Sequence, residues 1–413
     1  MYFYLIIMPK TSCNYEELIN FTRKLIQTRS LPGEEKEVAE LIAHKMEELK
    51  YDSIEIDGIG NVIGVIEGAS SKPVVMFNGH MDHVAAGPRE MWPVDPYSAE
   101  IIDNAIWGRA AADMKGALAA MIFAGGKVVE QFRDNLIGTI YVTCVVMEEP
   151  SLECIGMKYL FENDGLKADY VIIGEATNFD IANGGRGRIE VEIKTYGKAC
   201  HSSAPWRGIN ALYKMAKVLL ELEKLNEKLP SHPILGRSSL AVTAISCRPG
   251  IPDYDTVPDE ATIILERRLV PPENEETALR QFQELLNKLA REDPEFKASV
   301  KIREVKVKDY LGNTHILRKV MGRPWIIDEN HPLVQEAAKT VEKVIGRKPK
   351  IRPYTFGTDA NYTAGVLGIP TIGIGPGEEK YTHTYEDHIK IRDLTNAYKV
   401  YLELMLKLTR ETK

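Results

Sequence analysis

Residues 73–82 read PVVMFNGHMD, an apolar run that stops at His80 and Asp82. A short continuous apolar run bounded by polar residues is typical of a buried β-strand. The runs at residues 140–147, 170–174 and 370–375 have the same character, and the side chains that follow them are, in chain order, Glu148, Glu149, Glu175 and His383. Because ligands bind outside the carboxyl ends of strands in open α/β sheets, we expect these side chains to share one site. Acids and imidazoles gathered in this way are what a hydrolytic two-metal centre needs.

The spacing of apolar residues predicts an α/β fold with two domains. Helical periodicity over residues 15–27 and 34–49 alternates with short β-like runs up to residue 175, which indicates a mostly parallel sheet with helices on its faces. From about residue 187 the order becomes strand, helix, strand, strand, helix, strand, with the last strand expected over residues 298–307. That order describes an inserted ferredoxin-like βαββαβ domain. We therefore predict a catalytic domain in two parts, 1–187 and 312–413, and an inserted domain over 188–311.

The composition is that of a globular protein. The 413 residues carry a net charge of −7, and no basic block is interleaved with aromatic residues, which argues against a nucleic-acid partner. The apolar start MYFYLIIM is too short for a membrane span or a usual signal peptide, and we interpret it as a β-strand or as a start codon placed too early, with Met8 as the real start. Five cysteines without a CxxC pair argue against a disulfide framework and a thiolate zinc site, which favours a cytoplasmic location.

Two of the candidate acids each have two interpretations. Side chains alternate along a strand, so His80 and Asp82 lie on the same side of an extended segment. A carboxylate behind a metal-bound histidine orients the ring, although a structural His-Asp pair is the alternative. Asp113 is placed to cap a helix that starts at Met114, or to present an oxygen to a metal.

Glu148 and Glu149 are adjacent, so their side chains diverge. One can bind a metal while the other acts as the general base toward a water molecule. An isolated Glu-Glu pair is more often part of a solvated loop. His383 and His388 both stand in the segment YTHTYEDHI, and their spacing alone does not choose between them.

The motifs as a set carry a family resemblance that spans the chain from about residue 16 to its last helical segment. In order they read NGHMDHV, WGRAAADMKGALAA, VVMEE, IIGEAT, GKACHSSAPWRGINA, TFGTDA with GIPTIGIGPG, and HTYEDH. The sequence resembles the dinuclear-zinc aminoacylase-like hydrolases. That family includes acetylornithine deacetylase, succinyl-diaminopimelate desuccinylase and related dipeptidases and carboxypeptidases.

The resemblance implies the metal ligands. Asp113 would bridge two divalent ions, His80 and Glu175 would complete one site, and Glu149 and His383 would complete the other. The resemblance also favours His383, which is followed by a threonine, over His388. Oxygen and imidazole ligands suit Zn²⁺ and also admit Co²⁺ or Mn²⁺.

The resemblance further implies the reacting groups. Glu148 is expected as the general base and Asp82 as the residue that orients His80. His201, in the inserted domain, resembles the histidine that dimeric members send into the partner subunit's active site to stabilise the oxyanion, so we expect a homodimer. The substrate-binding residues expected from the matching motifs are Asn210, Arg268, Gly357 and Thr358.

Some positions depart from the family pattern. Pro150 and Ser151 replace the usual glycines after the acidic pair, and Asp255 stands where many members have an asparagine. Glu266 replaces a common aspartate two residues before Arg268. Arg268 therefore either grips a substrate carboxylate or forms a structural ion pair with Asp255 or Glu266. The TVPD segment and the Glu-Glu-Pro variant are closer to the branch associated with selenium or purine metabolism.

These observations predict a metal-dependent hydrolase that cleaves an amide bond in a small N-acyl amino acid, ureido compound or dipeptide. The inserted domain is expected to serve as a lid and dimer surface. One alternative is an aminopeptidase or carboxypeptidase of the same family. Another is a binding protein without catalysis on a hydrolase scaffold, against which the intact Glu148 argues, because a binding module needs no base.

Overall fold

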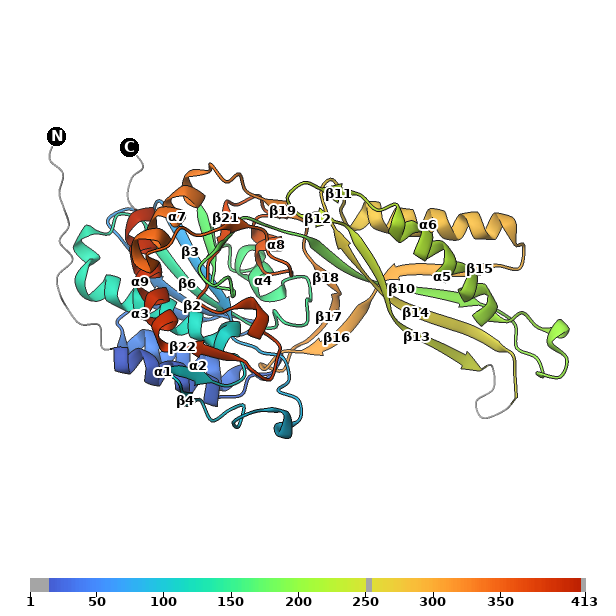
Figure 1. Cartoon of the computed structure of the whole chain (residues 1–413), viewed down its shortest axis with the longest axis horizontal. Coiled ribbons are helices and arrows are strands. Elements are labelled where there is room, and N and C mark those ends of the chain that lie inside the picture. Colours follow the sequence, from blue (N-terminus) through green and yellow to red (C-terminus); the bar gives the residue numbers. More distant parts are fainter. Residues whose placement is uncertain (1–14, 250–254, 410–413) are drawn as a thin grey trace.

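The fold consists of an α/β domain and a smaller elongated domain that projects from it (Figure 1). The structure is a computed structural model that describes residues 15–249 and 255–409. The N-terminal run MYFYLIIM, including the choice between Met1 and Met8, lies outside the described residues, as does Cys13. The predicted α/β class is confirmed. Within the described residues, no helix combines the length and the apolar character needed to cross a lipid bilayer.

The larger domain is built on an eight-stranded sheet. Its central strands β6 (Thr139–Val145), β3 (Val74–His80), β7 (Tyr170–Ile173) and β21 (Thr371–Gly373) are parallel neighbours in that order, so their carboxyl ends lie at one edge. The sheet is mixed: its centre is parallel, as predicted, and antiparallel pairs flank this centre. The flanking strands are β1 (Ser53–Ile56), β2 (Val62–Ile66), β8 (Ile181–Ala182) and β20 (Ile351–Arg352).

Helices cover the sheet and form one apolar core with it. α3 (Gly116–Gln131) buries almost all of its side chains, because it packs between strands β3 and β6, helix α1 and helix α9. The amphipathic α1 (Tyr15–Gln27) buries one stripe that includes Leu18 and Leu25. The other helices of this domain are α2 (Lys36–Glu48), α4 (Ile155–Glu162), α7 (Pro332–Ile345), α8 (Ala360–Thr363) and α9 (Ile391–Leu408).

Small strands complete the larger domain. β4 (Glu100–Ile102), β5 (Ala105–Trp107) and β22 (His388–Lys390) form a three-stranded sheet. β9 (Gly184–Gly185) pairs with β19 (Trp325–Ile326) where the chain leaves for the inserted domain and returns from it.

The inserted domain has the predicted βαββαβ order. Its strands are β10 (Gly187–Tyr196), β13 (Ser239–Pro249), β14 (Pro258–Leu269) and β15 (Lys297–Ile302), and its helices are α5 (Ala211–Glu227) and α6 (Glu275–Glu292). The antiparallel sheet runs β13-β14-β10-β15, and a separate apolar core joins it to both helices. Two short strands, β11 (Ser231–His232) and β12 (Gly236–Arg237), form a small hairpin.

The strand expected over residues 298–307 is broken. β15 ends at Ile302, and β16 (Glu304–Lys308) leaves the sheet to form a hairpin with β17 (Thr314–Arg318). β18 (Val320–Met321) pairs with β10 beyond the end of β15, so a longer β15 would have no free edge to pair with. Residue 311 lies in the turn of the β16–β17 hairpin, and the division of the chain at 187/188 and 311/312 stays a prediction.

The β16–β17 hairpin contacts the loop between α1 and α2. A Cβ atom added at Gly33, whose φ is +83°, would lie 2.4 Å from the Lys308 carbonyl oxygen. The Tyr310 hydroxyl donates to the Gly60 carbonyl oxygen over 2.9 Å. The β16–β17 hairpin is therefore held on the larger domain by close backbone packing and by a side-chain hydrogen bond.

We expect Gly33→Ala to lower the thermal unfolding midpoint more than Gly346→Ala. Both glycines have left-handed backbone angles, with φ of +83° and +77°, but an added Cβ at Gly346 meets no atom within 4 Å. Backbone strain alone costs Gly346→Ala about 1 kcal/mol, and the clash with Lys308 adds about 1–3 kcal/mol at Gly33. Equal midpoints for the two variants, followed by circular dichroism, would show that the hairpin does not pack closely here.

Candidate metal centre

The parallel strand ends bring the predicted acids and imidazoles together. His80 is the last residue of β3, Glu149 follows β6, and Glu175 follows β7. Asp113 and His383 approach from the loops that precede α3 and β22. The five side chains form two groups whose potential ligand atoms lie within 4.8 Å of one another.

Asp113 belongs to both groups. Its Oδ1 lies 3.2 Å from Nε2 of His80, which is also 3.4 Å from Oε1 of Glu175. Its Oδ2 lies 3.3 Å from Nε2 of His383, which is 3.0 Å from Oε2 of Glu149. One carboxylate therefore faces two three-residue groups, one through each oxygen.

Asp113 does not cap a helix, in contrast to one of its two sequence interpretations. Asp113 and Met114 have non-helical backbone angles, and α3 begins only at Gly116. The buried Lys115 donates from Nζ to the Thr28 carbonyl oxygen over 2.6 Å, which fixes the chain between the site and the helix. The Asp113 side chain is thereby left to the site.

Asp82 makes contacts that the sequence reasoning missed. Its carboxylate oxygens accept hydrogen bonds from the backbone amides of Glu148 and Glu149, each over 3.1 Å. Nδ1 of His80 lies 2.9 Å from the Asp82 carbonyl oxygen and 3.6 Å from the carboxylate. The closer partner of the His80 ring is therefore the backbone of Asp82, while its carboxylate holds the backbone of the acidic pair.

The electrostatics of the groups reflect a crowded set of charges. Burial would raise the pKa of Asp113, but hydrogen bonds from His383 and His80 hold it well below its usual range. Those same contacts with Asp113, and with Glu149, raise the pKa of His383 to about 10. Burial and the Asp113 charge raise the pKa of Glu175 to about 7.

Glu148 differs from these residues because it lacks a partner. It is buried, and its Oε1 has no hydrogen-bond partner among the described residues. Burial raises its pKa well above the ordinary value; His80 opposes this shift, and the charges of Glu175, Asp359 and Glu149 add to it. An unpaired carboxyl beside two ligand groups is placed to exchange a proton.

The donor set fits two divalent cations. Five carboxylates, contributed by Asp82, Asp113, Glu148, Glu149 and Glu175, are gathered around only two imidazoles. Such an excess of buried negative charge is costly without compensating cations. Neutral imidazole and carboxylate ligands are typical of Zn²⁺ and related metals.

The structure does not bring His201 and Asn210 to this site within one chain. His201 is exposed on the inserted domain, where its Nδ1 contacts the hydroxyl of Ser203 at 2.8 Å. The side-chain oxygen of Asn210 accepts from the Leu212 amide over 2.9 Å and caps α5.

Arg268 and the TFGTDA motif lie in different surroundings. Nε of Arg268 lies 2.7 Å from Glu266, and Glu266 also binds Arg188 at 2.7 Å, so the contact with Glu266 foreseen as an alternative is present. Gly357 is half-buried, and Thr358 is buried with its hydroxyl accepting from the Ala360 amide.

A buried carboxylate that the sequence reasoning did not single out holds the Asp113 loop. Asp387 accepts hydrogen bonds from the amides of Ala110 (2.8 Å) and Ala112 (2.9 Å) and pairs with Arg109. Its only sequence signal was its place in the HTYEDH motif. His388, in the same motif, stacks on Trp107 with ring centroids 4.5 Å apart.

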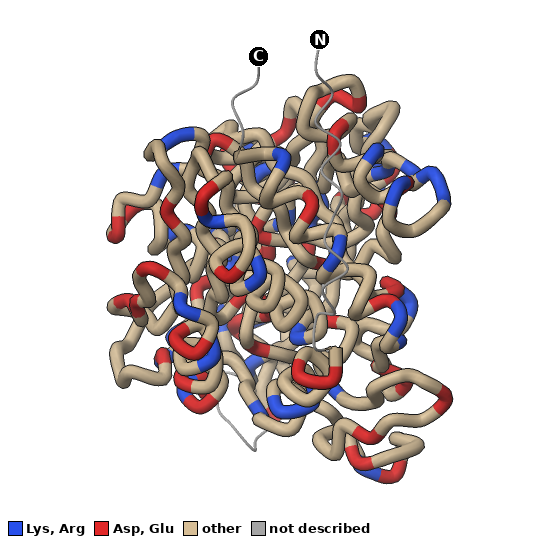
Figure 2. The backbone as a smooth tube through the Cα atoms, turned by 90° about the vertical axis from the view of Figure 1, so that its left-hand side faces the viewer, with Lys and Arg blue, Asp and Glu red and all other residues tan. Residues whose placement is uncertain are grey.

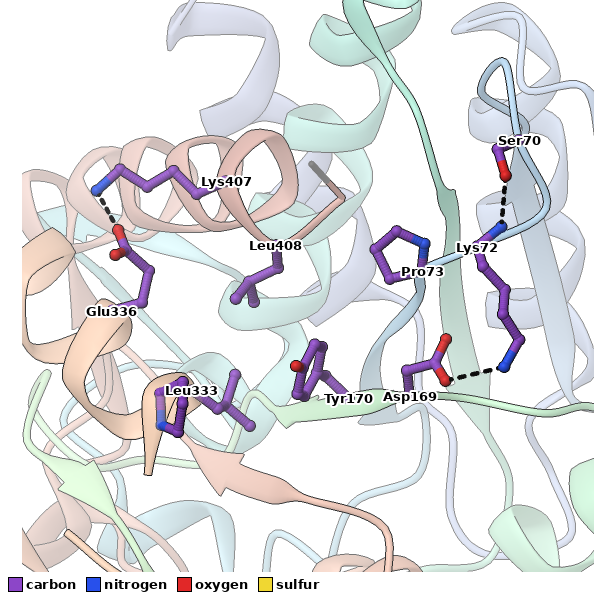
Figure 3. Close-up of a pocket in the computed structure, with 10 residues that line it drawn as sticks. Ser70, Lys72, Pro73, Asp169, Tyr170, Leu333, Glu336, Lys407 and Leu408 are labelled. Carbon is purple, nitrogen blue, oxygen red and sulfur yellow. Dashed lines mark hydrogen bonds and ion pairs between the residues drawn. The ribbon is translucent and has the colours of Figure 1, made fainter. Parts of the chain in front are cut away.

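A separate cavity is remote from this site. It measures about 740 Å³ and is lined by Pro73 and Tyr170, at the opposite ends of β3 and β7 (Figure 3). Its lysines are already paired, Lys72 with Asp169 and Lys407 with Glu336.

Acidic and basic residues are interspersed along the chain in the view of Figure 2.

Comparison with known proteins places this site in a family. Residues 76–407 match the sequence profile of peptidase family M20/M25/M40. The chain belongs to this family. The resemblance inferred from the motifs is confirmed, and so is the expectation of a hydrolase.

Relatives in the M20/M25/M40 family cover almost the whole chain. An uncharacterised protein of Escherichia coli strain K12, YgeY, is 31% identical over 93% of this chain and 94% of its own length. Succinyl-diaminopimelate desuccinylase of Thioalkalivibrio sulfidiphilus is 23% identical over 96% of this chain and 100% of its own. The crystal structure of Bacillus subtilis YXEP, described as a dinuclear metal-binding peptidase of family M20, superposes with a TM-score of 0.70 at 16% identity, over 95% of this chain and 97% of that one.

We predict that His83→Gln flattens the acid dependence of stability. Nε2 of the buried His83 accepts from the Ser30 amide over 3.0 Å, and burial, with a smaller effect of Lys115, lowers its pKa to about 4. An unfolded histidine has a pKa of about 6.5, so below that pH the unfolded chain gains a proton that the folded chain does not. Stability therefore falls as the pH drops from about 6.5 to about 4, by on the order of 3 kcal/mol.

The measurement is the thermal unfolding midpoint of both proteins between pH 7 and pH 5.5. The metal ligands are common to the two proteins, so the difference between their slopes isolates His83. Parallel pH profiles would show that His83 is not held neutral.

Proposed function

We propose that this chain is a two-metal amidohydrolase that cleaves small N-acyl or ureido amino acids or dipeptides. The observation that carries the proposal is the sharing of Asp113 between two ligand groups, with the buried Glu148 carboxyl close enough to feel the charges of His80, Glu175 and Glu149. The proposed ligands are His80, Asp113, Glu175, Glu149 and His383.

Zinc is the proposed metal, with cobalt or manganese as substitutes that the same donors accept. When bound, a pair of divalent ions polarises an amide carbonyl and lowers the pKa of a water molecule. The description of YXEP as a dinuclear metal-binding peptidase supports the number of ions.

Glu148 acts as the general base. Its buried carboxyl accepts a proton from the attacking water, whose oxygen bonds to the carbonyl carbon. The same carboxyl then returns the proton to the leaving nitrogen as the carbon–nitrogen bond breaks. Asp82 positions this base by holding the Glu148 and Glu149 amides, and it positions His80 through its carbonyl oxygen.

The relatives and the residues near the site support the proposed substrate class. The desuccinylase similarity supports an N-acyl amino acid, and the similarity to YXEP supports a peptidase as the second candidate. Gly357 and Thr358 are proposed to line the substrate site, because the next residue, Asp359, is hydrogen-bonded to Asn78 on β3 at 3.0 Å. Their sequence neighbours thus lie close to the ligand-bearing strand.

Arg268 and Asn210 are proposed as more distant substrate contacts in the inserted domain. Arg188 shares Glu266 with Arg268 and Glu190 with Arg303, so three cations face two carboxylates there and a positive charge is left for an acidic substrate group. Asn210 is proposed to contact the substrate from the start of α5, where its side chain caps the helix.

A cytoplasmic homodimer is proposed as the working form. His201 is exposed and makes its side-chain contacts within its own loop, so it is available to a second subunit. In that arrangement its imidazole stabilises the oxyanion in the partner's site.

We predict that Glu148→Gln lowers kcat by about 100-fold or more, while both ions stay bound. The amide keeps the shape of the side chain but cannot accept the proton. The measurement combines metal content per chain with turnover of N-acetyl, N-succinyl and N-carbamoyl amino acids and of dipeptides. Full activity in the metal-loaded variant, or a wild-type chain that takes up no zinc, cobalt or manganese, would overturn the proposal.

A mixture of two inactive variants tests His201. We expect Glu148→Gln and His201→Ala to be inactive alone and to recover up to about one quarter of the wild-type activity after refolding together as an equal mixture. Half of the dimers would then be mixed, and each would hold one site with both residues intact. No recovery, with mixed dimers shown by mass spectrometry, would place His201 outside the partner's site.

A further inference from the structure

The loop over residues 28–35, which joins α1 to α2, contacts three of the segments that carry the site. We name it the connecting loop. Its Ser30 hydroxyl donates to the Met81 carbonyl oxygen over 2.7 Å, just after His80. The backbone carbonyl of Thr28 accepts from Lys115, two residues after Asp113. The third contact, from Glu35, reaches the segment of the catalytic base.

Glu35 is a buried carboxyl that ordinary structural roles do not explain. It is 0% exposed, its Oε1 accepts from the Met147 amide over 3.2 Å, and its Oε2 has no hydrogen-bond partner among the described residues. It stands at the N-cap position of α2 but makes no side-chain cap hydrogen bond. No ion pair of Glu35 with a cation is present in the described chain.

The electrostatic surroundings make this position costly for a carboxyl. Burial and the nearby Asp82 charge raise the pKa of Glu35 to about 8, against the opposing effect of the backbone amides of Gly33, Glu35 and Met147. An apolar side chain would avoid this cost. The carboxyl is therefore more consistent with a function than with stability.

The Glu35 carboxyl accepts a hydrogen bond from a strained part of the backbone, at Met147. The φ of Met147 is +53°, in the left-handed region that non-glycine residues rarely adopt. As a result three consecutive amides, those of Met147, Glu148 and Glu149, each donate to a buried carboxyl oxygen: the first to Glu35 and the next two to Asp82. Strained backbone of this kind persists only where surrounding groups hold it, and it clusters at functional sites.

We propose that Glu35 is a positioning residue for the proposed catalytic base: its carboxyl holds the Met147 amide and so fixes the strained turn that carries Glu148. The inference rests on the proposed function, because it assigns a purpose to the position of Glu148. Glu35 itself touches neither substrate nor metal ligand side chains in the contacts described above.

The test compares Glu35→Met, which removes the acceptor and keeps a similar length, with Glu35→Gln, which keeps an amide oxygen to accept from Met147. We expect Glu35→Met to lower kcat by about tenfold or more, because small displacements of a catalytic group have large effects on rate. KM should stay within about twofold and both metals should stay bound. Glu35→Gln should restore most of the lost kcat. Glu35→Ala serves as a second variant without an acceptor if the methionine variant does not fold.

Glu403→Gln is the matched control. Glu403 is a buried glutamate on α9 that pairs with Lys343 at 2.9 Å, far along the chain from the base. Its substitution should change the unfolding midpoint without changing kcat. A loss of kcat in this control equal to that of Glu35→Met would overturn the proposal, because it would show a general effect of losing a buried carboxyl.

Hydrogen exchange separates this inference from the proposed function. In metal-loaded protein, the amides of residues 147–149 should exchange faster in Glu35→Met than in the wild type, and at the wild-type rate in Glu35→Gln. This readout needs no turnover, so it holds even if no substrate is found. Unchanged exchange, unchanged kcat in Glu35→Met, or an equal loss of kcat in Glu35→Met and Glu35→Gln would each overturn the positioning role. An inactive wild-type chain with the expected exchange pattern would count only against the proposed function.

Discussion

The structure depends on one electrostatic constraint, which is the gathering of five carboxylates and two imidazoles at one edge of a buried sheet. Like charges in a low-dielectric interior repel strongly, so the arrangement needs compensating cations and hydrogen-bond donors. The parallel order of β6, β3, β7 and β21 makes the gathering possible, because it points four strand ends to one edge. A fold that stabilises this concentration of negative charge is consistent with three observations: the family match, the two ligand groups and the unpaired Oε1 of Glu148.

Backbone amides compensate part of this negative charge, and they do so in the same way at two places. Asp387 accepts from Ala110 and Ala112, just before Asp113, and Asp82 accepts from Glu148 and Glu149. In each case a fully buried carboxylate accepts from two nearby amides and fixes the short segment that carries a proposed ligand or the proposed base. Asp113, Glu148 and Glu149 therefore project from backbone segments that are themselves held by acids.

The sequence predicted the strand ends because their signal is local: an apolar run buries itself, and the first polar residue marks where the strand leaves the core. It predicted the inserted domain for the same reason. It did not predict that β15 stops at Ile302, because this depends on β18 taking the neighbouring edge of β10 from a distant part of the chain. The helix cap at Asp113 was equally open in sequence, since the choice depends on where His80, His383 and Asp387 lie. Asp387 and Glu35 were missed because single buried acids carry no periodic pattern.

The two acids that hold the segment of the proposed base, Glu35 and Asp82, lie outside the two ligand groups. Glu35 and Asp82 hold three successive amides, those of Met147, Glu148 and Glu149, through contacts within the protein itself. The connecting loop that supplies Glu35 is itself packed against the hairpin through Gly33 and Lys308. A base fixed in this way needs little rearrangement when the reaction begins, and such preorganisation is a major source of rate enhancement in enzymes. The unfavourable burial of the Glu35 carboxyl is thus explained if this carboxyl keeps the proposed base in position before the reaction begins.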